Sequence, residues 1–400
     1  MNKNDILDNS LNITPESFLP KYYKLKQALL TDIQNGVYPP NSKLPSESQL
    51  RKKYNISSTP IKRVIRELVS EGIIYTIQGK GCFVNGSKLE TSKIYQNINI
   101  DYMRNKRIVF ITPGMLDGFY SPILQGLLKM IQKRGYRLEI YNSEGEYAVE
   151  MKLLSKCLEE MISGLIFIPN SYERDYRHLF QIQKKGIPVI LVDRNIKNSY
   201  FDYVGSDNIN ASKSAVKYLI KLGHKRILYW GRRWKKDNSS TILERYEGYR
   251  QALIESGIKI DPDLVLDDAK GTYYTWEIEV EDKVKKLLKK KIKFTAIFAI
   301  NDGLAINIYR KFKQIGIKVP QDVSIIAFDD SEIAEKFELP ITTVRQDVYG
   351  MGLKAGEQLF KRIDAILEGK QNSFATFKPE KIFSDTKLII RKSVCDLRNR

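Results

Sequence analysis

The spacing of hydrophobic positions changes along the chain and divides it into two regions. Between residues 20 and 84, apolar residues recur at helical intervals in three short stretches, and two short strand-like runs follow. From residue 107 onward, short apolar runs alternate with longer amphipathic segments, a pattern typical of a parallel α/β sheet. We therefore predict a small α+β domain followed by a larger α/β domain.

The first region begins with two predicted helices. Leu25, Leu29 and Ile33 share one face of a helix that is expected to end near residue 36. Ser46, followed three positions later by Gln49, is a capping-box pattern that marks the start of a second helix.

A third helix and a hairpin complete this region. Ser57 is expected to cap a helix that runs to Ser70, and two strands are predicted at Ile73–Ile77 and Cys82–Val84. Six basic residues and no acidic one lie between Ser48 and Arg66. Three short helices followed by a hairpin, with basic residues on the third helix, predict a winged helix-turn-helix domain. The third helix of such a domain lies in the major groove of DNA.

The second region contains many strand–helix units. Helical segments are expected at 121–134, 208–222, 242–256, 273–291 and 302–316. Strands are expected at Ile108–Thr112, Leu138–Tyr141, Gly164–Ile168, Val189–Val192, Arg226–Trp230, Ala296–Ile300 and Val323–Phe328. So many units in about 290 residues indicate two doubly wound lobes with parallel sheets. The lysine-rich stretch at 285–291 is interpreted as the solvated face of one of these helices.

The composition and charge of the chain limit the classes of function that it could have. The net charge of +19 favours an acidic partner such as nucleic acid or a membrane surface. No run of 18 apolar residues and no secretory signal is present, and the three cysteines form no CxxC pair, so we expect a cytoplasmic protein that does not use the membrane. With two histidines and no cysteine cluster, we expect neither a metal nor another cofactor.

The motifs and the histidine content of the sequence argue against an enzyme. The sequence has no GxSxG elbow, no Walker loop and little histidine for acid–base chemistry. A transport-type binding receptor is a further alternative, but it would not carry a winged helix.

The first region resembles the GntR family of bacterial regulators over residues 22–84. The resemblance is carried by the runs GVYPPNSKLPSESQLRKKYNIS and EGIIYTIQGKGCFV. It implies DNA contacts at Ser46, Glu47, Ser57, Ser58, Thr59, Lys62, Arg63, Gly79, Lys80 and Gly81. Ser58 and Lys62 occupy positions where the family favours arginine, the residue best suited to a bidentate guanine contact, so the operator sequence cannot be taken from relatives.

The second region resembles the effector-binding domain of the LacI/GalR regulators, which is similar to periplasmic sugar-binding proteins, over residues 106–392. The matching runs include YVGSDNINASKSAVKYLIKLGHKRILYW and AIFAINDGLAINIYRKFKQIGIKVPQDVSIIAFDD. The resemblance implies ligand contacts at Tyr120, Asp193, Arg194, Arg245, Asn301, Asp329 and Gln346. Phe119, Tyr120 or Trp276 could supply an apolar wall for a sugar, whereas Asp302 and Asp330 could instead cap helices.

The combination of the two domains resembles the arabinose-responsive repressors of Gram-positive bacteria. The predicted boundaries are an N-terminal extension at 1–19, the winged helix at 20–84, a linker at 85–105 and the effector domain at 106–395. The expected function is repression controlled by a small-molecule effector, with an arabinose-like pentose as the first candidate. The expected partners are that effector, double-stranded operator DNA with inverted half-sites, and a second copy of the chain bound through the effector domain. A non-sugar effector such as a nucleobase, or activation in place of repression, remains the alternative.

Overall fold

The computed structural model contains two compact units. The first contributes the described residues up to 85, and the second contains most of those from Tyr102 onward. The described residues are 25–26, 28–29, 32–33, 37–39, 41–54, 56–70, 73–85, 101–114, 118–197, 199–232, 239–269, 276–369 and 378–398. Most of the predicted linker lies outside these ranges. Its last part is helical at residues 101–104, and Met103 is buried in the second unit.

The N-terminal unit has the predicted helices and hairpin. Its elements are α2 (Glu47–Tyr54), α3 (Ser58–Ser70), β1 (Ile74–Ile77) and β2 (Gly81–Val84). The strands β1 and β2 pair antiparallel, with Ile74 opposite Val84. The described residues of the first predicted helix are helical, and Leu25, Leu29 and Ile33 are buried in the core of this unit, as their spacing predicted. The predicted end of that helix near residue 36 lies outside the described residues.

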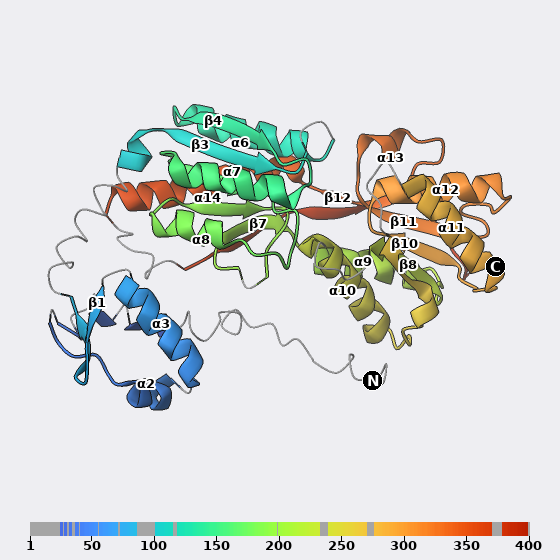
Figure 1. Cartoon of the computed structure of the whole chain (residues 1–400). Helices are drawn as coiled ribbons and strands as arrows, with labels where there is room; N and C mark the ends of the chain where they lie inside the picture. Colours follow the sequence, from blue (N-terminus) through green and yellow to red (C-terminus); the bar gives the residue numbers. More distant parts are fainter. Residues whose placement is uncertain are drawn as a thin grey trace. The chain divides into compact units, whose positions relative to one another are not determined.

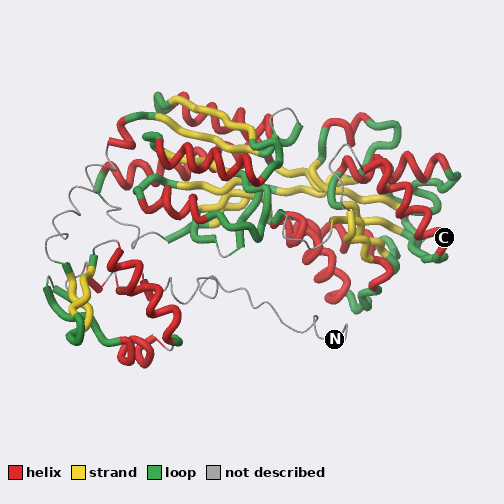
Figure 2. The backbone as a smooth tube through the Cα atoms, in the orientation of Figure 1, coloured by secondary structure: helices red, strands yellow, loops and turns green. Residues whose placement is uncertain are grey.

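The C-terminal unit has two lobes, each built on a six-stranded sheet that is covered by helices (Figures 1 and 2). The first lobe contains β3 (Arg107–Thr112), α6 (Tyr120–Lys133), β4 (Arg137–Asn142), α7 (Tyr147–Glu159), β5 (Gly164–Phe167), α8 (Arg177–Lys184), β6 (Val189–Val192), β7 (Asp202–Ser206), α14 (Val348–Leu367) and β13 (Lys381–Ser384). The second lobe contains α9 (Asn208–Lys221), β8 (Ile227–Arg232), α10 (Ser240–Glu255), the 3-10 turn Pro262–Leu264, β9 (Val265–Ala269), α11 (Trp276–Lys289), β10 (Ala296–Ala299), α12 (Asp302–Gln314), β11 (Ser324–Asp329), α13 (Glu332–Lys336), β12 (Thr342–Gln346) and β14 (Thr386–Ile389).

The sheet of the first lobe is buried on both faces. Its strand order is β13-β7-β6-β5-β3-β4, and every pair is parallel. Alternate residues of β3 point to opposite faces. Ile108 and Phe110 pack with residues of α6 and α14, whereas Val109 and Ile111 pack with residues of α7 and α8. Burial on both faces explains why the central strands β3, β5 and β6 appear in the sequence as continuous apolar runs.

The second sheet has the order β14-β12-β11-β10-β8-β9. Its core joins apolar residues of the strands to those of α9, α10, α11 and α12. The lysines at 285–286 and 289–291 are exposed, as expected for a solvated helix face. His224 precedes β8, and its ring nitrogens contact the Thr295 hydroxyl and the Cys395 carbonyl.

The chain crosses between the lobes three times, at Asp207, Asp347 and Asp385. The parallel strands β7 and β12 both end at a crossover, so the carboxyl edges of the two sheets meet there. One strand departs from the prediction of purely parallel sheets, because β14 pairs antiparallel with β12. The chain enters β14 from the crossover at Asp385, where β12 ends, and must therefore run in the opposite direction.

Helices α6 and α14 of the first lobe approach each other closely at two glycines. A Cβ atom on Gly126 would overlap the Tyr349 carbonyl, and one on Gly352 would overlap the Ile123 carbonyl. The helices can pack at this distance because neither glycine carries a side chain.

No helix among the described residues is long and apolar enough to cross a membrane.

Candidate functional sites

The reading surface of the N-terminal unit begins with the predicted capping box. The Ser46 N–H donates to Gln49 Oε1 at 2.8 Å, and the Gln49 N–H points back to Ser46 Oγ at 3.4 Å. This reciprocal pair fixes the start of α2. Ile61, Val64 and Leu68 on α3 are fully buried, so the opposite face of that helix is turned outward.

All ten residues proposed to contact DNA are exposed or partly exposed. They are Ser46, Glu47, Ser57, Ser58, Thr59, Lys62, Arg63, Gly79, Lys80 and Gly81. The two wing glycines adopt positive φ, +75° at Gly79 and +106° at Gly81, which places Lys80 at the tip of the hairpin. These residues are therefore available to a large partner such as duplex DNA.

Among these ten residues, only Arg63 forms an ion pair within the described part of the unit. Its Nε lies 3.0 Å from Glu67 Oε1, and the other oxygen of Glu67 lies 2.8 Å from the buried ammonium of Lys26. The carboxylate therefore holds the guanidinium on the surface of α3. The sequence predicted the position of Arg63 but gave no sign of this pairing.

In the second lobe, three predicted ligand residues come together where strands end. Arg245 extends from α10, Asp329 ends β11 and Gln346 ends β12. Arg245 Nη2 lies 3.1 Å from Asp329 Oδ1, and Gln346 Nε2 donates to the same oxygen at 2.8 Å. The guanidinium also stacks 3.8 Å from the ring centroid of Phe328. Donors, an acceptor and an aromatic face are thus held together, which is the set that a polyhydroxylated ligand requires.

Asn301, and not Asp302, caps α12. Asn301 Oδ1 accepts the Leu304 N–H at 2.9 Å and so caps α12. Asp302, which was considered as a possible cap, is buried and accepts hydrogen bonds from the Ser331 N–H and hydroxyl and from the Thr343 hydroxyl. A cap at Asp302 is therefore wrong, and this carboxylate instead holds the loop that follows β11.

A cap at Asp330 is also wrong. Its carboxylate lies 2.5 Å from Arg345 Nε and 2.6 Å from Arg391 Nη1. Ser331, and not Asp330, precedes the first residue of α13.

In the first lobe, the predicted residues form a second cluster. Arg194 Nη2 donates to the Tyr120 hydroxyl at 2.7 Å, and Arg194 Nε lies 3.5 Å from Asp193 Oδ2. Tyr120 is the first residue of α6, and its ring packs edge-to-face on Phe119. Of the three candidates for an apolar wall, the side chain of Trp276 lies outside the described residues.

Glu150, a buried carboxylate beside this cluster, was not among the residues predicted from the sequence. Glu150 accepts the Asn170 N–H at 2.8 Å and the Tyr176 hydroxyl at 2.9 Å. Burial raises the pKa of Glu150 to about 7, although the hydrogen bonds and the charge of Arg194 oppose the increase. Glu150 lies in the first turn of α7 and accepts the N–H of a residue just after β5, a contact that the periodicity of the sequence does not reveal.

Asn208 and Glu244 were also missed, and both join the Arg245 cluster. Asn208 Oδ1 accepts from Arg245 Nε at 3.1 Å, while its Nδ2 donates to Glu244 Oε2 at 2.9 Å. Burial raises the pKa of Glu244 to about 7, and the Asn208 hydrogen bond opposes that increase. Their positions in the chain could have pointed to them, because Asn208 directly follows a crossover and Glu244 directly precedes Arg245.

Three aspartates in or next to the two clusters have an unusual backbone conformation. Asp193, Asp329 and Asp330 have positive φ of 59°, 111° and 57°, in a region that side-chain-bearing residues rarely adopt. Such strain tends to accumulate at functional sites, where the surrounding contacts hold it in place. The two lobes also touch here, because the Asn195 N–H donates to Ser240 Oγ at 2.8 Å.

A winged helix with an open basic face, joined to a two-lobed unit with polar clusters at the carboxyl edges of its sheets, defines a DNA-binding regulator with a sensor domain. Residues 21–84 match the model of the bacterial regulatory proteins of the gntR family, and residues 216–394 match the periplasmic binding protein-like domain. The chain belongs to the HTH-type transcriptional regulators, with a gntR-family DNA-binding domain and a periplasmic-binding-protein-like domain of the LacI type.

Two relatives and one solved structure illustrate these similarities. The HTH-type transcriptional regulator RegA of Clostridium saccharobutylicum is 30% identical over 261 residues, which are 65% of this chain and 76% of RegA. The arabinose metabolism transcriptional repressor of Halalkalibacterium halodurans is 25% identical over 390 residues, 95% of this chain and 98% of that protein. The transcriptional regulator CelR in complex with cellobiose has a TM-score of 0.64 at 22% identity, covering 84% of this chain and 91% of CelR, and shares its fold.

Proposed function

We propose that the protein is a cytoplasmic transcriptional repressor that leaves its operator when a sugar binds between the lobes of its sensor domain. The observation that carries this proposal is the similarity to the arabinose metabolism repressor of H. halodurans, which extends over 98% of that protein and so spans both domains. An arabinose-like pentose is accordingly the first candidate effector.

The chemistry of the two clusters supports a sugar ligand. We assign ligand contacts to Tyr120, Asp193, Arg194, Arg245, Asn301, Asp329 and Gln346. Gln346 is 4% exposed, and its Oε1 has no hydrogen-bond partner in the described structure. Leaving a buried acceptor unpaired costs about 1–3 kcal/mol, so a ligand hydroxyl that donates to this oxygen would be bound favourably.

Asn301 contributes to this site through its amide nitrogen. Its Oδ1 is occupied by the helix cap, whereas Nδ2 makes no hydrogen bond among the described residues. The cap fixes the side chain and leaves two N–H donors for a sugar oxygen. Phe119 and Tyr120 supply the apolar wall on the side of the first lobe.

On the DNA side, the ten exposed residues of α2, α3 and the wing form the reading surface. A single winged helix buries little area on DNA, whereas a twofold dimer presents two copies to inverted half-sites. The protein is therefore proposed to bind its operator as a homodimer assembled through the sensor domain.

Two measurements test this function. Duplexes selected from a random library by the full chain should contain inverted repeats, and sedimentation should give a dimer on and off DNA. A thermal-shift screen with pentoses, hexoses, sugar phosphates and nucleobases should raise the melting temperature with a free sugar, because a ligand that binds only the native state stabilises it. The same sugar should release the selected duplex in a gel shift.

The outcomes separate the parts of the proposal. A shift with nucleobases alone would overturn the sugar assignment, and a single asymmetric half-site bound by a monomer would overturn the dimer. Tighter DNA binding in the presence of the sugar would contradict release by an inducer.

A further inference from the structure

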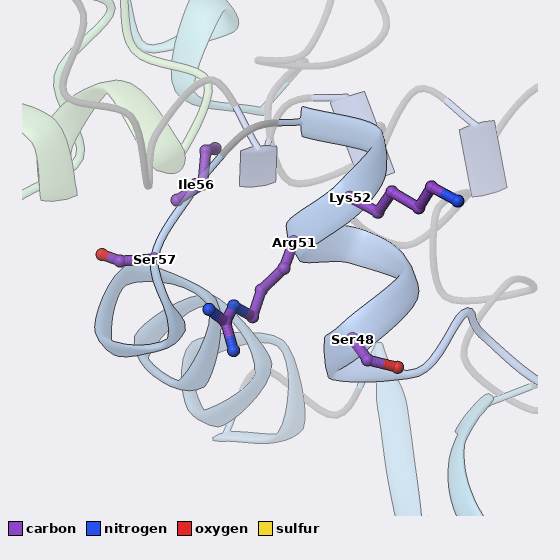
Figure 3. Close-up of a pocket in the computed structure, with 5 residues that line it drawn as sticks. All are labelled: Ser48, Arg51, Lys52, Ile56 and Ser57. Carbon is purple, nitrogen blue, oxygen red and sulfur yellow. The ribbon is translucent and has the colours of Figure 1, made fainter.

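Helices α2 and α3 border an open hollow of about 410 Å³ on the surface of the winged helix. It is lined by Ser48, Arg51, Lys52, Ile56 and Ser57. Figure 3 shows the guanidinium of Arg51 extending from α2 toward the first turns of α3, whereas Lys52 extends in another direction. The lining carries two positive charges and no negative one, so it favours an anion.

The charges of Arg51 and Lys52 have no ion-pair partner within the described structure, unlike those of two basic neighbours. Arg63 is paired with Glu67 at 3.0 Å, and Lys53 lies 3.3 Å from Asp32. Arg51 makes no hydrogen bond or ion pair with any described residue. Its planar fork of N–H donors is therefore available to a ligand.

The geometry fits a phosphate group. A guanidinium binds two phosphate oxygens at once, and the small polar residues Ser48 and Ser57 line the same hollow. The first N–H groups of α3 lack partners within the helix and favour negative charge nearby. A hollow of about 410 Å³ is far larger than one water needs, so it also admits the sugar that adjoins a backbone phosphate.

We propose that this hollow seats one phosphate of the DNA backbone, held by Arg51 beside the start of the reading helix. The proposal rests on the DNA-binding function proposed above and assigns the positioning contact to Arg51. A phosphate contact fixes the register of the protein on the duplex without reading sequence. Inorganic phosphate shares this chemistry and is the other possible occupant.

The test compares the full-length wild type with Arg51→Gln on a duplex that the wild type has selected from a random library. Affinity is measured by fluorescence anisotropy at several salt concentrations. Loss of one phosphate contact should reduce the slope of log K against log salt by about 1 for each bound head. It should also weaken selected and scrambled duplexes by the same factor. Lys53→Gln is the matched control, because it removes an equal charge from the same helix and should keep the wild-type slope.

Neutral methylphosphonate placed at single positions of the duplex locates the contact. At one position in each half-site, the substitution should weaken the wild type but not Arg51→Gln. An unchanged slope with Arg51→Gln, or a loss confined to the selected sequence, would overturn the assignment. Binding of inorganic phosphate that disappears in Arg51→Gln, together with an unchanged DNA slope, would assign the hollow to the free anion instead.

Failure of this inference is distinct from failure of the proposed function. A wild type that selects no sequence contradicts DNA-based regulation itself. A wild type that binds its selected duplex and is matched by Arg51→Gln contradicts the phosphate seat alone.

Discussion

Arg245 and Asp329 form an ion pair at 3.1 Å that joins α10 to the end of β11. Burial raises the pKa of Asp329, and the neighbouring guanidinium opposes the increase. Arg245 is held independently of this partner, because it also donates to Asn208 Oδ1 and to the Ile300 carbonyl. The pair is therefore a rigid arrangement of donor and acceptor, and its acceptor can be removed without releasing the arginine.

Asp329→Ala should abolish the response to effector while leaving operator binding intact. A lost charge-assisted hydrogen bond costs about 2–3 kcal/mol, which is roughly a hundredfold in effector affinity. Isothermal titration with the sugar found in the screen measures this loss, and a gel shift measures operator affinity.

Asp364→Asn is the control for Asp329→Ala. Asp364 on α14 forms an exposed ion pair with Arg134 at the end of α6, so this variant should behave as the wild type. Wild-type induction of Asp329→Ala would show that the effector binds elsewhere.

Glu150 should make stability depend on pH. Its folded pKa of about 7 lies above the usual 4.5, so the folded state holds an extra proton between these values. The stabilising contribution is complete below about pH 4.5 and is lost as pH rises through about 7. At about 1.4 kcal/mol per pKa unit, the change is on the order of 3 kcal/mol.

Glu150→Gln, which cannot ionise, should therefore gain stability relative to the wild type as pH rises from 5 to 8. Urea unfolding at each pH measures the difference, with exposed Glu159→Gln on the same helix as a control that should follow the wild type. A difference that does not vary with pH would refute the assignment to Glu150.

Lys62 on α3 and Lys80 at the tip of the wing are both exposed and should each neutralise one phosphate. Changing either to alanine should reduce the salt slope of DNA binding by about 1 for each head and weaken all sequences alike. Lys285→Ala removes an equal charge from α11 in the sensor domain and should have no effect on the slope. If both variants kept the wild-type slope and affinity, the reading surface would lie elsewhere.

Gly352→Ala should destabilise the first lobe, because the new Cβ would overlap the Ile123 carbonyl on α6. Backbone atoms cannot rotate aside, so we expect a loss of about 1–3 kcal/mol or more in the free energy of unfolding. Gly118→Ala is the control, since no atom lies within 4 Å of a Cβ built there. Chemical denaturation measures both, and equal stabilities would contradict the close approach of the two helices.

The sequence predicted local features well because they depend on neighbouring residues. The capping box of Ser46 and Gln49 formed as expected. The apolar runs of the buried strands likewise allowed these strands to be predicted from neighbouring residues alone. The short strand β7, in contrast, contains Asp202 and Gly205, and it was not predicted because its polar residues interrupt the apolar signal.

Contacts between distant residues could not be predicted in the same way. The pairing of Asp302 with Thr343 spans 41 positions, and that of Asp330 with Arg391 spans 61. Both aspartates stand beside helix starts, so the local pattern favoured caps. Only the folded arrangement of β11, β12 and the segment after β14 brings their true partners to them.

The glycine contact between α6 and α14 has a mechanical consequence for the sensor. Tyr120 opens α6, and Asp347 immediately precedes α14 at one of the crossovers. Because the two helices meet backbone to backbone, neither can slide past the other without a clash. We therefore expect α6, which begins at Tyr120, and α14, which begins directly after Asp347, to move as one body.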